Sequence, residues 1–123
     1  MLLATVKYLV YADKFRISQV IQNLIDNSIR FTRNKGRISL TLSHKTVHSK
    51  KIVVLSVAEN GEALRPELLS RLFTKFSSDS YYGAGIGLFL CRRIVEAHNG
   101  KIWAINNKSE GGCTFSFGIP KKG

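Results

Sequence analysis

Segments with helical periodicity and segments with strand-like patterns follow one another along this chain without the strict alternation of a doubly wound fold. Apolar residues recur at helical spacing from Asp13 to Phe31 and from Ile86 to His98, and Pro66 marks the first turn of a shorter helix. Five segments have the apolar patterns of strands: 5–11, 37–43, 52–58, 102–106 and 113–119. The polar residues 44–51 are predicted to form a hairpin loop. This order predicts an α+β two-layer sandwich, in which a mixed sheet is covered on one face by about three helices.

One domain is expected over residues 1–123, because 44% apolar residues fill a single core and no repeat or proline-rich linker divides the chain. A membrane span is not expected, since the apolar stretches are short or interrupted by Lys7, and no signal-peptide pattern opens the chain. Cys91 and Cys113 lack the spacing of a zinc site or a disulfide framework, which fits a reducing compartment.

The chain carries a strong excess of positive charge. Nineteen Lys and Arg against eight Asp and Glu give a net charge of +11, although only 22% of the residues are charged. Such a balance is compatible with a nucleic acid, a membrane surface, an acidic protein or a phosphorylated ligand as the partner. The basic residues are scattered, with no dense stripe and no interleaved aromatic residues, which disfavours nucleic acid.

The polar face of the helix from Asp13 to Phe31 is the first candidate site. Asn27 lies four residues after Asn23, and Arg30 lies three residues after Asn27. On a helix this spacing places two amides and a guanidinium in one row. An amide oxygen is a suitable ligand for Mg²⁺, and a guanidinium fork suits phosphate. Taken alone, the row is better explained as a solvated helix face.

A glycine-rich run, Gly83-Ala84-Gly85-Ile86-Gly87-Leu88, leads directly into the second long helix. Glycines permit close approach of a ligand, and the free N–H groups of the first helical turn favour phosphate. A dinucleotide fingerprint would need glycine where Leu88 stands and a strand immediately before the run, and a Walker motif is absent. The alternative is a hinge before a helix.

Glu59-Asn60-Gly61 follows a strand that is apolar almost throughout, and could face a pocket or form an ordinary turn. His44, His48 and His98 stand near no serine or cysteine motif, so no nucleophilic triad is expected and all three are predicted to be surface residues.

These pieces, in this order, resemble the catalytic and ATP-binding domain of sensor histidine kinases, within the Bergerat-fold (GHKL) superfamily that also includes gyrase and Hsp90. Residues 13–32 resemble the N box of that family, 72–76 its F box, 83–88 its G2 box and 112–117 its terminal strand motif. The resemblance covers nearly the whole chain.

The resemblance implies roles for the helix and the glycine-rich run. Asn27 would be a Mg²⁺ ligand, and Asn23 and Arg30 would act at the triphosphate as the catalytic residues. Phe31 and Thr114 would lie near the adenine. The G2 box would bind phosphate, chiefly through backbone N–H groups, and its residues are Gly83, Gly85, Ile86, Gly87 and Leu88. Residues 77–84 would form an ATP lid anchored by Phe73 and Phe76.

One motif departs from the family pattern. The G1 box of the family is DxGxG, whose Asp accepts a hydrogen bond from the adenine amino group, whereas this chain has Glu59, Gly61 and Ala63 at the three motif positions. Glu59 keeps an acceptor but is longer by one methylene, and Ala63 adds a methyl group. Loss of a well-formed buried hydrogen bond costs about 1–3 kcal/mol, so adenine affinity is expected to fall about tenfold or more.

The resemblance implies ATP-dependent phosphoryl transfer to a histidine on a separate helical dimerisation domain, followed by transfer to a response regulator. Neither nucleic acid nor membrane contact is implied, and the location would be cytoplasmic, alone or as part of a membrane-anchored sensor. Asn23 stands where gyrase-like relatives have a hydrolytic Glu, which favours a kinase over an ATPase. A regulatory pseudokinase and an anti-sigma-type serine kinase remain alternatives.

Overall fold

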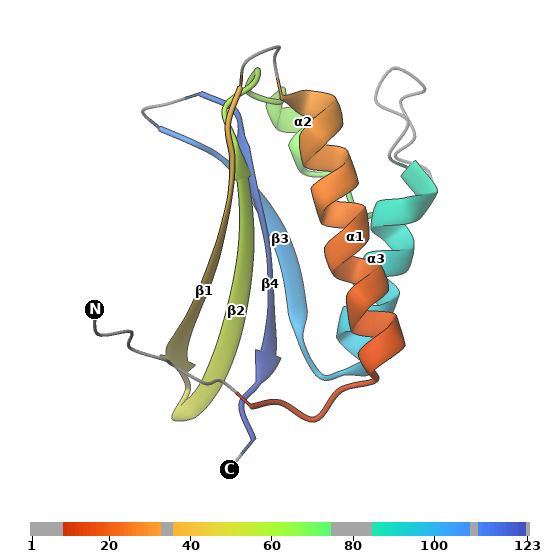
Figure 1. Ribbon diagram of the computed structural model, residues 1–123, viewed down its shortest axis with the longest axis vertical. Helices are drawn as coiled ribbons and strands as arrows, with labels where there is room; N and C mark the ends of the chain where they lie inside the picture. Colours follow the sequence, from red (N-terminus) through yellow and green to blue (C-terminus); the bar gives the residue numbers. More distant parts are fainter. Residues whose placement is uncertain (1–8, 33–35, 75–84, 109–110, 123) are drawn as a thin grey trace, which may run out of the picture.

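A four-stranded sheet and a layer of helices make up the part of the chain that the computed structural model describes, residues 9–32, 36–74, 85–108 and 111–122. The elements in chain order are α1 (Lys14–Phe31), β1 (Ile38–Val47), β2 (Lys50–Glu59), α2 (Pro66–Leu69), α3 (Gly85–Ala97), β3 (Lys101–Asn106) and β4 (Cys113–Pro120). All three helices lie on the same side of the sheet (Figure 1). The predicted α+β two-layer sandwich is confirmed.

The strand order is β1-β2-β4-β3, and each neighbouring pair is antiparallel. The described sheet is therefore not mixed, which corrects the prediction. The chain enters it as two hairpins, whose strands necessarily run in opposite directions, and the inner strands β2 and β4 also pair antiparallel. Of the strand predicted over 5–11, residues 5–8 lie outside the described residues, and Val10 forms only an isolated antiparallel bridge with Lys121.

Helix α1 begins where the sequence predicts. The Asp13 side chain accepts hydrogen bonds from the backbone N–H groups of Phe15 and Arg16 at 3.0 and 3.1 Å, as an N-cap does. The Asp13 N–H in turn donates to His98 Nε2 at 3.0 Å, and His98 Nδ1 lies 2.7 Å from the carbonyl oxygen of Ile94. His98 is half-buried and joins the start of α1 to the end of α3, so the expectation of a surface histidine is wrong there.

The hairpin between β1 and β2 is tighter than predicted. The strands run to Val47 and from Lys50, and only His48 and Ser49 form the turn, with φ of 50° and 66°. Two consecutive residues with positive φ are typical of a two-residue type I′ turn. Residues 44–51 look polar because β1 is an exposed edge strand, and the loop predicted there is wrong.

Helix α3 ends at Ala97, and Asn99 then takes a left-handed conformation with φ of 61°. The Gly100 N–H donates to the Val95 carbonyl at 3.0 Å, which closes the last turn as predicted. Helix α2 is shorter than the prediction and ends at Leu69, after which the chain continues in turns. No helix of the described residues is both long and apolar enough to cross a membrane.

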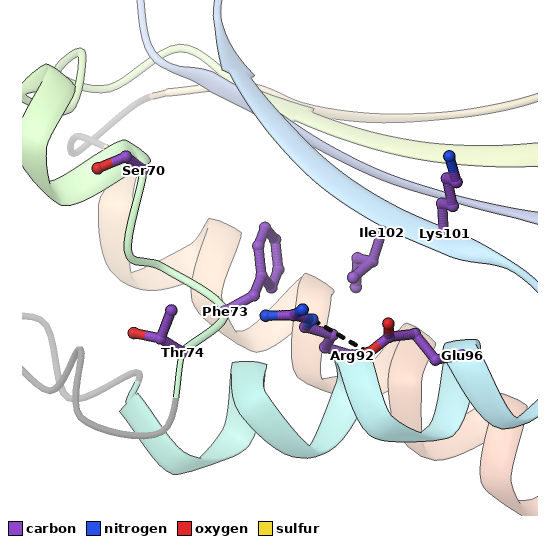
Figure 2. Close-up of a pocket in the computed structure, with 7 residues that line it drawn as sticks. All are labelled: Ser70, Phe73, Thr74, Arg92, Glu96, Lys101 and Ile102. Atoms are coloured by element: carbon purple, nitrogen blue, oxygen red, sulfur yellow. Dashed lines mark hydrogen bonds and ion pairs between the residues drawn. The ribbon is translucent and has the colours of Figure 1, made fainter.

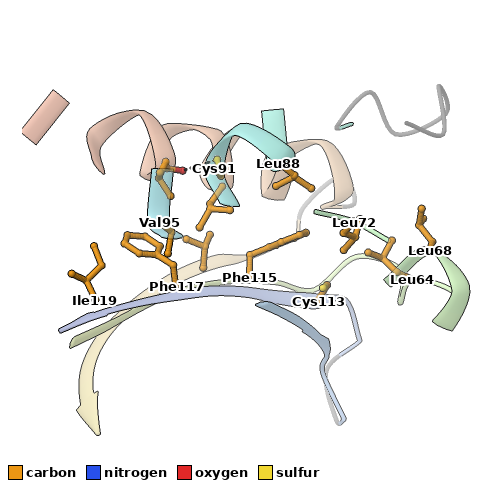
Figure 3. Packing of buried hydrophobic residues seen from close by; sticks show 13 residues of the cluster. Leu64, Leu68, Leu72, Leu88, Cys91, Val95, Cys113, Phe115, Phe117 and Ile119 are labelled. Carbon is orange, nitrogen blue, oxygen red and sulfur yellow. Dashed lines mark hydrogen bonds between the residues drawn. The ribbon is translucent and has the colours of Figure 1, made fainter. Parts of the chain in front are cut away.

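The hydrophobic core lies between the helices and one face of the sheet, as Figure 3 shows. Phe115, Phe117 and Ile119 of β4 point toward α1 and α3 and are buried. Leu24 of α1 and Leu88 of α3 are wholly buried against them. The core therefore fixes the two long helices on the sheet.

Candidate nucleotide-binding site

One end of the molecule brings together most of the residues that the sequence singled out. Helices α1 and α3 run in opposite directions, so the C-terminal end of α1 and the N-terminal end of α3 lie at the same end as the finish of β2 (Figure 1). Because a helix N-terminus carries unpaired N–H groups and a partial positive charge, this end of the fold is suited to an anion.

The two asparagines of α1 are held by their own helix. Asn27 Nδ2 donates to the Asn23 carbonyl at 3.0 Å, and Asn23 Nδ2 donates to the Gln19 carbonyl at 3.2 Å. Each amide oxygen consequently points away from the carbonyl to which its own nitrogen is bound. Asn27 is only 4% exposed, which excludes a merely solvated helix face at that residue. Arg30, one turn further, is exposed.

Helix α3 touches this amide row at Gly87. A Cβ atom there would lie 2.8 Å from Asn23 Oδ1, so the absence of a side chain lets the first turn of α3 approach α1. Gly85 opens the helix, and the Leu88 side chain is wholly buried in the core, so only its backbone could meet a ligand. Gly83 and Phe76 lie outside the described residues, as do the other residues of the predicted lid.

Glu59 is a buried carboxylate at the end of β2, 2% exposed. Its Oε2 accepts the Gly61 N–H and its Oε1 accepts the Cys113 N–H, both at 2.7 Å. Each carboxylate oxygen can accept a second hydrogen bond. Burial, reinforced by the Glu59 charge, raises the pKa of the Cys113 thiol to about 12.

Backbone packs directly on backbone around Glu59. A Cβ at Gly61 would stand 1.9 Å from the Phe31 carbonyl oxygen, and one at Gly112, whose φ is +76°, would stand 2.1 Å from the Glu59 carbonyl oxygen. The Phe31 ring stacks on Phe115 with 5.9 Å between centroids. The end of α1, the loop after β2 and the turn before β4 are thus locked together.

Two asparagines that the sequence analysis did not select fix the same loops. The Asn106 amide binds both backbone groups of Leu64, accepting from its N–H at 3.0 Å and donating to its carbonyl at 2.9 Å. Asn107 Nδ2 donates to the Glu59 carbonyl at 2.9 Å. The only sequence signal for these two residues was an Asn-Asn pair at the end of a strand. Ala63, the last of the three G1-box positions, is exposed.

Thr114 is not brought together with the other predicted residues. Cys113 and Phe115 face the helices, so Thr114, between them on β4, faces the opposite side of the sheet. Its hydroxyl donates to Asn107 Oδ1. On the helix side, the residue at this end of β4 is Cys113.

Comparison with known proteins decides the family. The model of the histidine kinase-, DNA gyrase B- and HSP90-like ATPases matches residues 12–123. The chain belongs to this ATPase family. The sensory kinase SasA of Parasynechococcus marenigrum is 40% identical over 116 residues, which cover 90% of this chain and 29% of SasA. SasA of Prochlorococcus marinus subsp. pastoris is also 40% identical and has 30% of its length covered.

Solved structures agree with this assignment. The catalytic domain of histidine kinase ThkA matches with a TM-score of 0.78 and 38% identity, over 91% of this chain and 70% of that domain structure. Full-length ShkA in complex with AMPPNP matches with a TM-score of 0.72 and 26% identity, over 94% of this chain and 23% of ShkA. The chain thus spans about three tenths of the curated kinases it resembles.

The F box of this ATPase-family chain begins beside a separate pocket. Leu72 is buried in the core, and the Phe73 ring lies near Ile102 of β3 (Figure 2). The pocket has a volume of about 300 Å³ and is lined by Ser70, Phe73, Thr74, Arg92, Glu96, Lys101 and Ile102. Arg92 Nε and Glu96 Oε1, one turn apart on α3, pair along one wall of the pocket at 3.1 Å. None of the predicted nucleotide-binding residues that the structure describes lines this pocket.

Proposed function

We propose that the chain binds Mg²⁺-ATP and transfers its γ-phosphate to a histidine of a separate helical dimerisation domain, as the catalytic domain of a two-component sensor kinase. The observation that carries the proposal is the contact of α3 with the amide row of α1, where Gly87 leaves room for Asn23. Membership of the ATPase family and the likeness to the ThkA catalytic domain support it.

The residues at this end of the fold fit a metal-bound triphosphate. Asn27 offers a hard amide oxygen from a buried side chain, which suits Mg²⁺. The first turn of α3, with Gly85 and Gly87, offers backbone N–H groups to phosphate oxygens. Mg²⁺, when bound, neutralises charge on the phosphate oxygens. The exposed Arg30 adds a positive charge beside them.

Asn23 favours transfer to a partner over hydrolysis. An amide cannot accept a proton from water as a carboxylate base does. The side chains of this site therefore hold and orient the γ-phosphoryl group while a histidine nitrogen of the partner attacks phosphorus and the bond to the β–γ bridging oxygen breaks, releasing ADP. A response regulator would take the phosphoryl group from that histidine, in the cytoplasm where ATP is held.

The base would bind beside the place where the loop after β2 packs directly on the end of α1. Glu59 retains two lone-pair positions beyond those used by Gly61 and Cys113, so it can accept from an exocyclic amino group. Phe31 and Ala63 would border the base. Thr114 lies on the far side of β4, where its hydroxyl is bound to Asn107. It would contact the base only after that hydrogen bond is given up.

Isothermal titration of the chain with ATP, with and without Mg²⁺, tests the proposal. Asn27→Asp keeps the shape of the side chain but replaces the neutral amide with a carboxylate. It should abolish Mg²⁺-dependent binding while the unfolding transition remains cooperative. Gln19→Glu makes the same amide-to-acid change two turns earlier on α1 and should leave binding intact. Normal binding by Asn27→Asp, or no binding by the unaltered chain at millimolar ATP, would refute the proposed site.

A further inference from the structure

The face of the sheet opposite the helices carries an apolar hollow of about 270 Å³. Val47 of β1, Ile52 of β2 and Trp103 of β3 contribute its apolar wall. Gly118 of β4 forms the floor, because a Cβ there would lie 2.8 Å from Ile52 Cγ2 and 3.7 Å from the Trp103 ring. A glycine at this position thus keeps open a space that a larger side chain would fill.

Lysines border the hollow on both edges of the sheet. Lys45 of β1 places its ammonium group 4.7 Å from the centroid of the Trp103 ring on β3, across the two central strands. Lys101 stands opposite Gly118 in the register of β3 and β4, and also lines the hollow. With the Lys45 ammonium group over the indole ring, the hollow has apolar walls and a positively charged rim.

No acidic side chain offsets these charges within the four described strands. Their only carboxylate is that of Glu59, which is buried on the helix side and bound to two N–H groups. The positive charge continues into an adjoining depression lined by Ser49, Lys50, Lys51, Asn99, Pro120 and Lys121. A partner that neutralises this face must bring its own negative charge.

We propose that this hollow and its lysine rim dock an acidic segment of a partner protein, with one apolar side chain of that segment seated in the hollow that Ile52 and Trp103 help to line. Charge complementarity selects an acidic partner, and the apolar wall selects a side chain instead of a phosphate backbone. Nucleic acid fits less well, because the indole face is occupied by Lys45 and no arginine lies in the described strands. An anionic membrane also fits less well, because the apolar groups form a hollow and do not project.

Trp103 is the only tryptophan of the chain, so its fluorescence reports directly on this surface. The probe is a short synthetic peptide of aspartate and glutamate residues around a central leucine pair. It should shift the Trp103 emission saturably, and its dissociation constant should rise steeply with salt. The same peptide with Asn and Gln in place of the acids, or with serines in place of the leucines, should bind at least about tenfold more weakly.

Lys45→Glu and, separately, Lys101→Glu should weaken binding of the probe by about tenfold or more. Lys108→Glu is the matched control, because it makes the same charge change beyond the other end of β3 and should alter binding less than about twofold. Thermal unfolding of each variant establishes that it is folded. An absent emission shift, equal binding of the neutral peptide, or an equal effect of Lys108→Glu would overturn the proposal.

A DNA duplex and phosphatidylserine vesicles complete the test. Tighter binding of either one than of the acidic peptide, read from the same emission, would assign the surface to that polyanion and overturn the protein-docking proposal. Since the hollow lies on the face opposite the nucleotide site, Asn27→Asp should leave peptide binding unchanged, which separates this inference from the proposed kinase function.

Discussion

Within the described residues, the burial of the Ser28 side chain in α1 is not compensated by a hydrogen bond to its hydroxyl. The side chain is wholly buried, and its hydroxyl has no hydrogen-bond partner among the described residues. An unsatisfied buried hydroxyl costs about 1–3 kcal/mol. Ser28→Ala should therefore increase the free energy of unfolding in urea. Ser18→Ala, exposed on the same helix, should gain only the helix propensity of alanine, about 0.5 kcal/mol. Equal gains in the two variants would show that the Ser28 hydroxyl is satisfied.

Glu59 should respond to the loss of a single acceptor. Both of its oxygens accept backbone N–H groups, from Gly61 and Cys113, so in Glu59→Gln one amide N–H₂ group must face a donor. We expect the free energy of unfolding to fall by about 2 kcal/mol, measured in urea. Glu62→Gln, at an exposed carboxylate in the same loop, should change it by less than about 0.5 kcal/mol. A loss at Glu59 no larger than at Glu62 would contradict the hydrogen bonds described here.

Site residues could be predicted from the sequence when one element supplies them. Asn23 and Asn27 share a helix, so their spacing alone places them together, and Asp13 is recognisable as an N-cap from its position. Glu59 and Asn107 depend on partners 54 and 48 residues away in the chain. No local pattern reveals such pairs. The face on which Thr114 lies could not be predicted from the sequence for a related reason, since the face of a strand depends on the register of its neighbours.

At the scale of elements, the β1–β2 turn can be improved. His48 and Ser49 both adopt positive φ, which costs energy for residues other than Gly and Asn. The double change His48→Asn with Ser49→Gly should raise the free energy of unfolding by about 1 kcal/mol, measured by urea denaturation. Ser43→Gly inside β1 is the control and should lower it by about 0.5–1 kcal/mol. Destabilisation by the turn variant would argue against the type I′ turn.

Elements with one buried and one exposed face were the easier ones to predict. α1 and α3 have long apolar stripes and clear ends, and both begin and end within a residue or two of the prediction. β1 is exposed almost throughout because none of the described helices covers that edge of the sheet, so its pattern could not distinguish a strand from a loop beyond Ser43. The order of the strands in the sheet also cannot be predicted from the periodicity of apolar residues, since it depends on which long-range strand pairs form.

At the scale of the whole molecule, the net charge of +11 should make stability depend on salt. Like charges repel more strongly in the folded state than in the expanded chain, and added ions screen that repulsion. The thermal midpoint should rise as NaCl increases from low to moderate concentration. The double variant Lys50→Glu with Lys121→Glu lowers the net charge to 11 − 4 = +7 and should give a shallower rise. If both proteins responded equally, the rise would reflect a general effect of the salt on burial. A shallower rise in the variant would locate the repulsion on the lysine-rich face of the sheet, where an acidic partner would relieve it too.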